Sequence, residues 1–269
     1  MSSFRTVELS DRNYENAGLR FLTVKSEHLK GRGDICVYVP EIEIDIKNIP
    51  IYILLHGVYG SAWAWAMKGG AHITAHNLIS NGEIKPAIVA MPSDGLWGDG
   101  SGYLTHQERN FAQWIVSDVP TAIIENISGA NTHSPWCIGG FSMGGYGALV
   151  LGSRFPNKFK AISAHSSITK FEQMASFVEE PLGSFKIQGL EKDVIDFVRR
   201  KPHELPPLRF DCGIQDDLLQ ANRELHRQLQ ELKIEHQYHE FKGGHEWPYW
   251  QKNLEHTLRF FDKQVTSWL

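Results

Sequence analysis

GGFSMGGYGALVLGSRFP, residues 139–156, places Ser142 between two pairs of glycines, where an apolar run passes directly into a helix-like run. A strand that turns at once into a helix forces the residue at the corner into a strained backbone conformation. Side chains beside that corner would collide with the neighbouring strand and helix, and Gly140 and Gly144 avoid the collision. The stretch therefore predicts a sharp corner with the Ser142 hydroxyl exposed above the edge of a sheet.

The pattern around this corner is G-x-S-x-G, which is typical of the nucleophile elbow of α/β-hydrolases. Three fixed positions are a weak signal, because glycine-rich turns often serve packing alone. The place of the corner between a strand pattern and a helix pattern strengthens the prediction. Small residues at Gly145, Gly147 and Ala148 would let the helix pack closely on the sheet. That helix should end at Phe155, since a residue before proline disfavours helical geometry.

A nucleophilic serine needs a histidine base and an acid that orients the base. In α/β-hydrolases these partners follow the serine, first the acid and then the histidine, each after a later strand. The run at 205–213 leads to Asp216 and Asp217, and the run at 235–243 leads to His245 behind a glycine pair. The carboxyl ends of parallel strands meet at one edge of a sheet. We therefore expect these side chains to meet near the serine.

Two neighbouring aspartates compete for the role of the acid. A turn over residues 213–216 would leave Asp216 at its tip. Asp217 would instead begin the following helix, where the helix dipole favours acidic side chains. We therefore prefer Asp216 as the acid and keep Asp217 as the alternative.

Thirteen histidines occur in the sequence, so the base also has competitors. His72 and His76 are four residues apart, but no glutamate follows His72 and no third metal ligand is evident, which favours a packing or solvated pair. His165 ends a strand pattern but precedes the acid, which is the wrong order. His236 and His239 fall within a strand pattern and are expected to face solvent or neighbouring side chains. The histidine behind the glycine pair is the best placed.

An oxyanion hole completes such a site with two backbone N–H donors. One donor should be the residue after the nucleophile, Met143, and the other should lie on the loop after an earlier strand. The run ILLHGVYGS ends in a His-Gly pair, so the N–H of Val58 is the expected second donor and Tyr59 the fallback. His56 is expected to be a hydrogen-bonded support rather than a catalyst.

Strand-like and helix-like runs alternate along the chain. Strands are predicted at 34–40, 49–57, 85–92, 133–141, 159–166, 205–213 and 235–243. Leucines on one stripe predict a helix over 217–233. Another helix is predicted near the C-terminus from apolar residues at spacings of three and four, namely Trp250, Leu254, Leu258, Phe261 and Val265. This alternation indicates an α/β fold with a mostly parallel central sheet and helices on both faces.

Residues 1–30 are expected to add antiparallel edge strands to this sheet. We find no internal repeat and no linker, so the interpretation is a single domain over 1–269. The segment 166–204, which lies between two predicted strands, is a candidate lid over the site.

The composition is ordinary for a globular protein, with 42% hydrophobic and 22% charged residues among 269. A net charge of −4 without a basic cluster gives no reason to expect nucleic acid. No run reaches the roughly 20 apolar residues of a membrane span, and no signal peptide is expected. The three cysteines (Cys36, Cys137 and Cys212) are expected to be reduced and buried, which favours the cytoplasm. The oligomeric state is open, with a homodimer as one alternative.

Five stretches together resemble the esterase D family of serine α/β-hydrolases, also called the "putative esterase" family. These stretches are ILLHGVYGSAWAW (53–65), IKPAIVAMP (84–92), GGFSMGGYGAL (139–149), DCGIQDDLL (211–219) and FKGGHEWPYW (241–250). The resemblance covers roughly residues 30–262, and its last two stretches are far more specific than G-x-S-x-G. It implies Ser142 as nucleophile, Asp216 as acid and His245 as base, and thus agrees with the residues reached above.

The resemblance also implies Val58 and Met143 as oxyanion donors. The family includes feruloyl, acetyl-xylan and tributyrin-type esterases, S-formylglutathione hydrolases and mycolyltransferases. The members that act on glutathione thioesters usually lack the His56–Gly57 pair, so this chain departs from them. The expectation that no secretion signal is present argues against an exported polysaccharide-degrading enzyme.

The predicted function is hydrolysis of short-chain acyl esters through an acyl-enzyme, on a small-molecule substrate and without a metal or cofactor. The alternatives are a thioesterase, peptidase or acyltransferase with the same triad, and a non-catalytic binding member of the fold. Tyr59, Trp63 and Trp247 are the candidate substrate contacts. Trp65 and Trp97 are further tryptophans that could line the pocket, and core packing alone would also explain each of these tryptophans.

Overall fold

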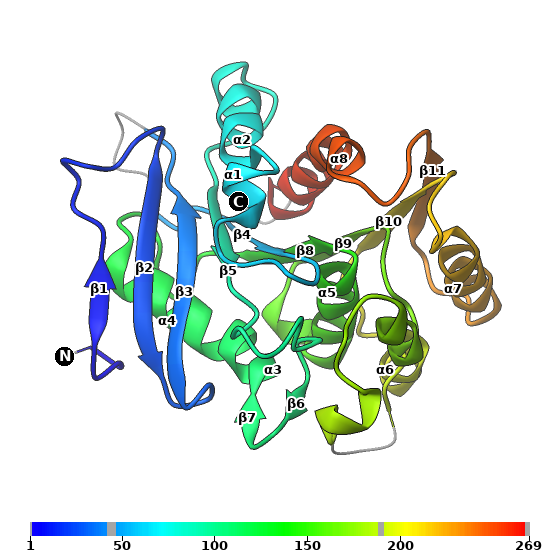
Figure 1. Cartoon of the computed structure of the whole chain (residues 1–269). Helices are drawn as coiled ribbons and strands as arrows, with labels where there is room; N and C mark the ends of the chain where they lie inside the picture. The colour runs from blue at the N-terminus through cyan, green and yellow to red at the C-terminus, as the bar shows by residue number, and fades with distance from the viewer. Residues whose placement is uncertain (1, 42–46, 188–190, 267–269) are drawn as a thin grey trace.

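The computed structural model describes residues 2–41, 47–187 and 191–266. Within these residues nine strands form one central sheet (Figure 1). In spatial order the strands are β1 (Val7–Leu9), β2 (Leu19–Ser26), β3 (Gly31–Tyr38), β5 (Ile88–Pro92), β4 (Ile51–Leu55), β8 (Trp136–Phe141), β9 (Ala161–His165), β10 (Leu208–Gly213) and β11 (Gln237–Phe241). The seven predicted strands are all present, together with two in the N-terminal segment.

The strands from β5 to β11 in this order are parallel to their neighbours, and β1, β2 and β3 add an antiparallel edge. The mostly parallel sheet and its antiparallel edge are therefore confirmed. The run predicted at 34–40 becomes β3, which belongs to the antiparallel part because it pairs with β2 in a hairpin and with β5 in the opposite direction. The central strands β4, β5 and β9 are buried along their whole length, as expected where helices cover both faces.

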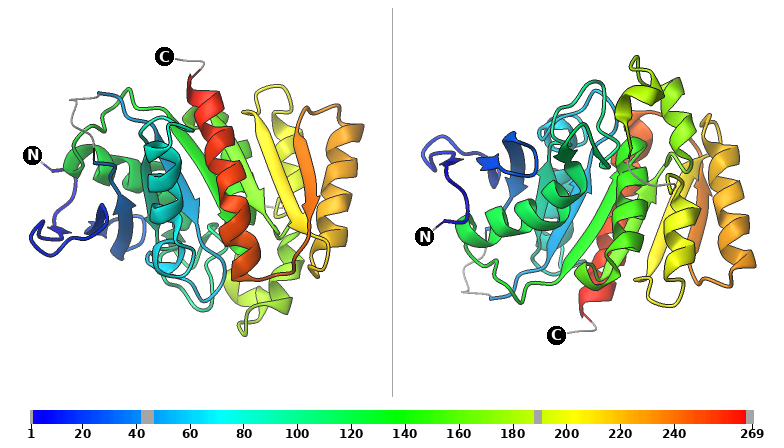
Figure 2. Two further views of the ribbon diagram at one scale, coloured as in Figure 1. Left: turned by 90° about the horizontal axis from the view of Figure 1, so that it is seen from above. Right: turned by 90° about the horizontal axis from the view of Figure 1, so that it is seen from below.

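Helices cover both faces of the sheet (Figures 1 and 2). One face carries α1 (Ala64–Met67), α2 (Ala71–Ser80) and α8 (Trp247–Thr266). The other face carries α3 (Phe111–Gln113), α4 (Val119–Asn126), α5 (Met143–Arg154), α6 (Val194–Arg200) and α7 (Leu219–Glu231). Each face thus has its own hydrophobic core against the sheet.

The amphipathic sequence patterns explain which side of each helix is buried. All five apolar residues singled out in α8 are buried, and each stabilises the fold by about 1.5–3 kcal/mol relative to exposure. In α7 the inward-facing residues include Leu225 and Leu229, while the helix is two residues shorter at each end than predicted. The predicted end of α5 at Phe155 is confirmed, since Arg154 is its last residue and Pro156 begins a 3₁₀ turn.

Several short elements lie outside the sheet. Two 3₁₀ turns, Phe171–Ser176 and Leu182–Phe185, follow β9 and precede α6. The loop after β5 leads into a two-stranded ribbon of β6 (Thr105–His106) and β7 (Arg109–Asn110) and a π-helix over Trp114–Asp118. The loop after β5 lies at the edge of the sheet that carries Ser142, because Gly100 in this loop borders Met143.

Two expectations from composition can be compared with the structure. The three cysteines are free and buried, as expected, and burial raises the pKa of the Cys36 thiol to about 12. Among the described residues no helix is long and apolar enough to cross a bilayer.

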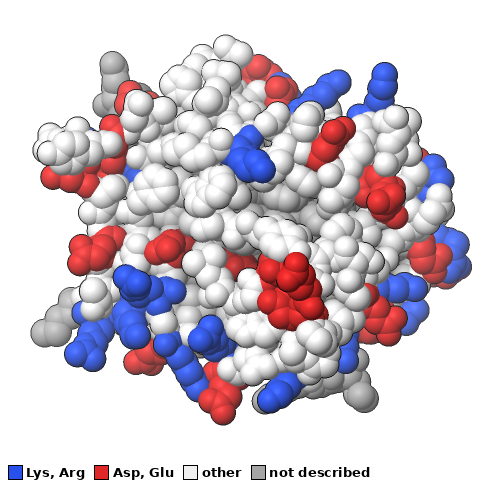
Figure 3. Space-filling view, viewed as in Figure 1, with Lys and Arg blue, Asp and Glu red and all other residues white. Residues whose placement is uncertain are grey.

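On the face seen in Figure 3, acidic and basic side chains are interspersed around a largely uncharged centre, with one compact acidic group beside it.

Candidate active site

Ser142 occupies the corner between β8 and α5. Its φ of 54° and ψ of −122° lie in a region that residues with a Cβ rarely adopt. A Cβ at Gly144 would lie 2.3 Å from the carbonyl oxygen of Leu55, and one at Gly140 would lie 2.4 Å from that of Gly144. Both glycines are therefore needed for this corner. The Ser142 N–H donates to the carbonyl of His165 on the next strand at 3.0 Å, which fixes the corner to the sheet.

The expected acid Asp216 and the expected base His245 lie on two turns that are hydrogen-bonded to each other. The Asp216 N–H donates to the carbonyl of Gly213 at 3.1 Å, which closes the predicted turn after β10. The next loop begins after β11, and its Gly243 carbonyl accepts the N–H of Gln215 at 3.0 Å. A Cβ at Gly213 would lie 2.3 Å from the Gly243 oxygen, so this close approach requires glycine. The contact holds the two loops together and sets the distance between Asp216 and His245.

Ser142, His245 and Asp216 form one hydrogen-bonded chain. His245 Nε2 lies 2.9 Å from Ser142 Oγ, and His245 Nδ1 lies 2.9 and 3.1 Å from the two carboxylate oxygens of Asp216. An ionised carboxylate can only accept, so Nδ1 carries the proton and Nε2 is left as the acceptor for the serine hydroxyl. This is the tautomer that a general base needs.

The environment of Asp216 keeps its carboxylate ionised. Burial acts to raise the pKa of Asp216, but hydrogen bonding and the charge of His245, together with the Leu218 N–H at 2.8 Å, outweigh burial and lower the pKa below its usual value. Asp217 is exposed and lies just before α7. The structure therefore brings Asp216, and not Asp217, into contact with His245.

The two expected oxyanion donors lie beside the serine. A Cβ built on Gly100 would be 2.4 Å from Met143 Sδ and 3.3 Å from Val58 Cγ1, so both side chains border this one glycine. Among the described residues, no hydrogen bond occupies the N–H of Val58 or Met143. The fallback donor Tyr59 already gives its N–H to the carbonyl of Asp99 at 2.8 Å. The geometry favours Val58 over Tyr59.

His56 is a support for this loop, as expected from the sequence. Its Nε2 accepts the Asp94 N–H at 3.0 Å, so Nδ1 carries the proton and donates to the Gly57 carbonyl at 2.7 Å. Its own carbonyl accepts the Tyr103 hydroxyl at 2.9 Å. His56 is buried, and its ring packs so closely against Gly60 that a Cβ there would be 2.3 Å from Nδ1.

The aromatic candidates for substrate contact occupy different environments. Tyr59 and Trp63 are exposed at 65% and 45% beside the oxyanion loop. Trp247 packs edge-on against the buried Trp65, whose indole N–H donates to the Leu55 carbonyl, so Trp65 is a core residue. Trp97 packs against Phe185 and His106, away from the catalytic chain, and joins a loop to the segment after β9.

Among the described residues, the side chains of the competing histidines make no hydrogen bond with Ser142, His245 or Asp216. His72 is buried in α2 and His76 is exposed on it, and within the described residues no group of three His, Cys, Asp or Glu side chains could hold a metal ion. His165 is fully buried and bonds the carboxylate of Asp211 at 2.9 Å. His239 is exposed on β11, and His236 bonds His226 at 2.7 Å.

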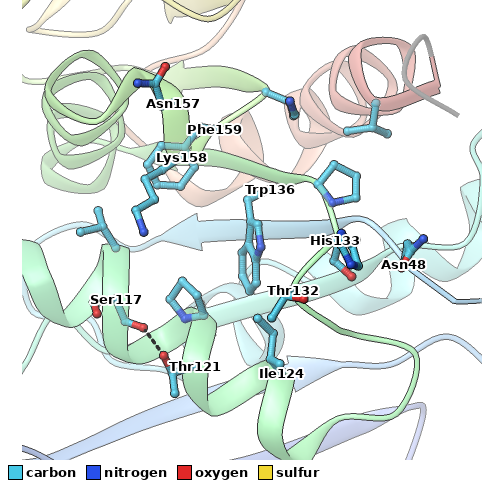
Figure 4. Close-up of a pocket in the computed structure, with 16 residues that line it drawn as sticks. Asn48, Ser117, Thr121, Ile124, Thr132, His133, Trp136, Asn157, Lys158 and Phe159 are labelled. Atoms are coloured by element: carbon cyan, nitrogen blue, oxygen red, sulfur yellow. Dashed lines mark hydrogen bonds between the residues drawn. The ribbon is translucent and has the colours of Figure 1, made fainter.

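A hollow of about 610 Å³ lies around Trp136, away from Ser142 (Figure 4). Trp136 stands at its centre, and Lys158, His133 and Asn48 lie around it. Trp136 is the first residue of β8, whereas Ser142 follows the last. This hollow is therefore at the opposite edge of the sheet and contains none of the three catalytic candidates.

Four residues at the site were not found from the sequence. Phe177 packs on the ring of His245 with the ring centroids 5.3 Å apart. Asp94, Asp99 and Glu180 hold the loops around the oxyanion donors through backbone hydrogen bonds. A short acidic residue before or within a glycine-rich loop, as in SDGLWGDGSG (93–102), is the one sequence signal that could have indicated such loop-capping roles.

Comparisons with known proteins show the family and the fold of this chain. The family model described as "Putative esterase" matches residues 26–261. An acetyl esterase of Caldicellulosiruptor saccharolyticus is 27% identical over 240 residues, which cover 82% of this chain and 86% of the relative. A ferulic acid esterase superposes with a TM-score of 0.78 at 22% identity, covering 96% of this chain and 99% of that one. An S-formylglutathione hydrolase of Staphylococcus aureus gives a TM-score of 0.77 at 17% identity, with 94% and 99% covered. The α/β-hydrolase fold is thereby established.

Proposed function

The chain belongs to the family described as "Putative esterase" and is an ester hydrolase, and we propose that Ser142, His245 and Asp216 carry out its reaction on short-chain acyl esters. The observation that carries this proposal is the hydrogen-bonded chain from Ser142 Oγ through His245 to the Asp216 carboxylate. Two unengaged N–H groups beside the serine, those of Val58 and Met143, support it further.

In the first half of the reaction, Ser142 Oγ attacks the ester carbonyl carbon while its proton passes to His245 Nε2. The carbonyl oxygen becomes an oxyanion, which the N–H groups of Val58 and Met143 stabilise. The Asp216 carboxylate stabilises the imidazolium that forms. When the carbon–oxygen bond to the alcohol breaks, His245 Nε2 returns the proton to the departing oxygen, and the acyl group remains on Ser142.

In the second half, water replaces the alcohol. His245 Nε2 takes a proton from the water as its oxygen attacks the acyl carbon, and the same two N–H groups hold the second oxyanion. The bond to Ser142 Oγ then breaks, the serine recovers the proton from His245, and the carboxylic acid leaves. Each proton returns to where it began, so one ester and one water give one acid and one alcohol.

The preference for short acyl groups rests on the site and on the relatives. One relative is an acetyl esterase, and acetyl is the shortest acyl group of this kind after formyl. Phe177 also lies against His245, which brings bulk close to the reacting atoms. We therefore propose acyl chains of C2 to C4 as substrates, with the alcohol part left to be identified.

The test is a series of p-nitrophenyl esters from C2 to C10, with thioester and amide substrates beside them. We expect kcat/KM to be greatest at C2 to C4 and ester cleavage to exceed thioester cleavage. A maximum at C10 would contradict the short-chain proposal, and a preference for thioesters would favour the thioesterase alternative.

The Ser142→Ala variant is the control for the chemistry. Loss of the nucleophile should lower kcat on p-nitrophenyl acetate by about 10⁶-fold, about 8 kcal/mol, and abolish labelling by a fluorophosphonate probe. The melting temperature should change little. Activity above about a hundredth of the wild type would rule out Ser142 as the nucleophile.

We further propose that the protein is located in a reducing compartment such as the cytoplasm. The support for this location is the presence of three buried, free thiols, which an oxidising compartment would not favour. Fractionation of cells that carry the native gene, with detection of the protein in each fraction, tests this location.

A further inference from the structure

The loop that carries Val58 is held on both sides of this donor. On one side, His56 accepts the N–H of Asp94. On the other, Tyr59 donates its N–H to the carbonyl of Asp99 at 2.8 Å. Asp94 and Asp99 belong to the same loop after β5, so this loop is hydrogen-bonded to residues on both sides of Val58.

Asp99 is in turn held by a segment that lies about eighty residues further along the chain. The Glu180 carboxylate accepts the Asp99 N–H through both oxygens, at 3.1 and 3.2 Å. In return, the Asp99 carboxylate accepts the Glu179 N–H at 2.7 Å. A Cβ at Gly98 would lie 2.3 Å from Glu180 Oε1, so the loop is shaped closely around this carboxylate. We call these reciprocal bonds between Asp99 and the pair 179–180 the latch.

The segment on the far side of the latch also touches the catalytic base. Phe177, three residues before Glu180, packs on the ring of His245. A second contact reinforces the latch, because Trp97 packs edge-on against the buried Phe185 with centroids 4.7 Å apart. One short segment, residues 177–185, therefore contacts both the base His245 and the loop after β5 that is bonded to Tyr59.

We propose that Asp99 and Glu180 are positioning residues, which act through Tyr59 to hold the Val58 N–H on the developing oxyanion. The proposal rests on the proposed function, because it takes Val58 as a donor. The proposal requires no contact between either carboxylate and the substrate. Two neighbouring carboxylates repel each other, and hydrogen bonds from backbone N–H groups to charged acceptors offset this repulsion. These hydrogen bonds hold Asp99 in place, and Asp99 in turn holds the loop of Val58 through the Tyr59 N–H.

The first test replaces Glu180 with Ala and compares it with Glu179→Ala. Both substitutions remove one negative charge from the same segment, but only Glu180→Ala removes the acceptor of the Asp99 N–H, since Glu179 contributes its backbone. Removing an oxyanion donor outright lowers kcat about 10²- to 10³-fold. For a displaced donor we expect a fall in kcat of about 10- to 100-fold in Glu180→Ala, with KM within about twofold. Glu179→Ala should match the wild type.

Two further variants separate positioning from a loss of folding. Glu180→Gln keeps an oxygen that accepts the Asp99 N–H, and it should recover most of kcat. Asp99→Ala keeps the backbone carbonyl that binds the Tyr59 N–H but removes the carboxylate that accepts the Glu179 N–H and interacts with the Tyr59 hydroxyl, so it should lower kcat in the same way as Glu180→Ala. Because both changes open the same latch, the double variant should lose less than the product of the two single losses.

The deciding readout is affinity for a transition-state analogue. An alkylboronic acid forms a tetrahedral adduct with the serine, so its inhibition constant should rise by the factor by which kcat falls in Glu180→Ala. Equal kcat in Glu180→Ala and Glu179→Ala would overturn the proposal. A raised KM at unchanged kcat would also overturn it, because it would make Glu180 a substrate contact. If the wild type cleaves no ester, the proposed function fails instead, which keeps the two results distinct.

Discussion

Ser142 has a backbone conformation that costs of the order of 1–3 kcal/mol for a residue with a side chain. The surrounding contacts hold it there: its N–H and its carbonyl both make hydrogen bonds, the latter with the N–H groups of Tyr146 and Ile168. The benefit is geometric. At this corner the hydroxyl points toward His245 while the N–H of Met143 stays unengaged, so the proposed nucleophile and one proposed oxyanion donor are adjacent residues.

Asp216 and Asp217 provide a direct test of which carboxylate serves the base. In Asp216→Asn the amide cannot stabilise the imidazolium, and it favours the wrong tautomer of His245. We expect kcat on p-nitrophenyl acetate to fall by roughly 10⁴-fold, about 5 kcal/mol. Asp217→Asn should keep activity close to that of the wild type, since this side chain is exposed. The expected change in stability for Asp217→Asn is no more than about 0.3–1 kcal/mol.

Both variants are assayed side by side, with melting temperatures to exclude unfolding. If Asp217→Asn were the inactive variant and Asp216→Asn the active one, the assignment of the acid would be wrong by one residue. If both kept full activity, the acid would lie elsewhere.

At this scale the sequence predicted those residues whose signals are local. Ser142 is marked by its glycines, and Asp216 and His245 by turns that directly follow strand patterns. Glu180 and Phe177 have no such mark, because their roles depend on partners about 65 to 80 residues away that only the folded chain brings close. The roles assigned to Val58 and to the triad stay predictions until variants are measured.

At the scale of elements, the loops after β10 and β11 act as one unit. Gly213 and Gly243 approach so closely that the first has no space for a Cβ, and the N–H of Gln215 bonds across the same gap. The side chains carried by these loops, Asp216 and His245, therefore depend on a contact between backbones rather than on their own rotamers alone.

Gly213→Ala tests this dependence. Its Cβ would meet the Gly243 oxygen at 2.3 Å, so one loop has to move. A displacement of about 1 Å in a catalytic group can cost about 10²-fold, and we expect a loss of this size in kcat. The cost in stability should be about 1–3 kcal/mol. Gly183→Ala is the matched control, because a methyl group added there would have no atom within 4 Å and the residue is exposed.

The measurement is kcat on p-nitrophenyl acetate together with unfolding by denaturant. Unchanged kcat in Gly213→Ala would show that the loops tolerate separation. An equal loss in Gly183→Ala would point to a general effect of alanine in place of glycine.

The elements themselves were predictable where the apolar pattern was long. All seven strands and the C-terminal helix follow from it, because burial on one face imposes a period and burial on both faces gives a continuous apolar run. The direction of β3 could not be read from its residues, since buried antiparallel and parallel strands have the same apolar character. Ends of helices such as α7 depend on capping in the folded chain, where Leu218 precedes the first turn without a side-chain cap.

At the scale of the whole molecule, a buried polar network ties the sheet to α8. The Asp211 carboxylate accepts from Arg209 Nη2 at 2.7 Å and from the Tyr249 hydroxyl at 2.7 Å, and it lies 2.9 Å from His165 Nδ1. Thr257 of α8 bonds both Arg209 and His165. No sequence pattern indicated this cluster, because its members come from separate strands and a helix. The cluster lies next to the corner, since the carbonyl of His165 accepts the N–H of Ser142.

Asp211→Asn tests how far the fold depends on this network. The substitution leaves the buried Arg209 cation without a carboxylate, and we expect a loss of about 3–5 kcal/mol in the free energy of unfolding at pH 7. Burial acts to raise the pKa of Asp211, but His165, Arg209 and Tyr249 outweigh it and lower the pKa to about 2. The unfolded chain, with an ordinary pKa near 3.8, therefore binds this proton first as the pH falls.

It follows that the contribution of Asp211 is fully present above about pH 4 and is lost as the pH falls toward about 2. The variant has no carboxyl at this position, so the gap in unfolding free energy between wild type and Asp211→Asn should narrow through this window. Denaturant unfolding at several pH values from 7 down to 3 measures the gap, with Asp217→Asn as a variant that should run parallel to the wild type. A gap that stayed constant down to pH 3 would contradict the lowered pKa, and the absence of any gap at pH 7 would show that the network does not stabilise the fold.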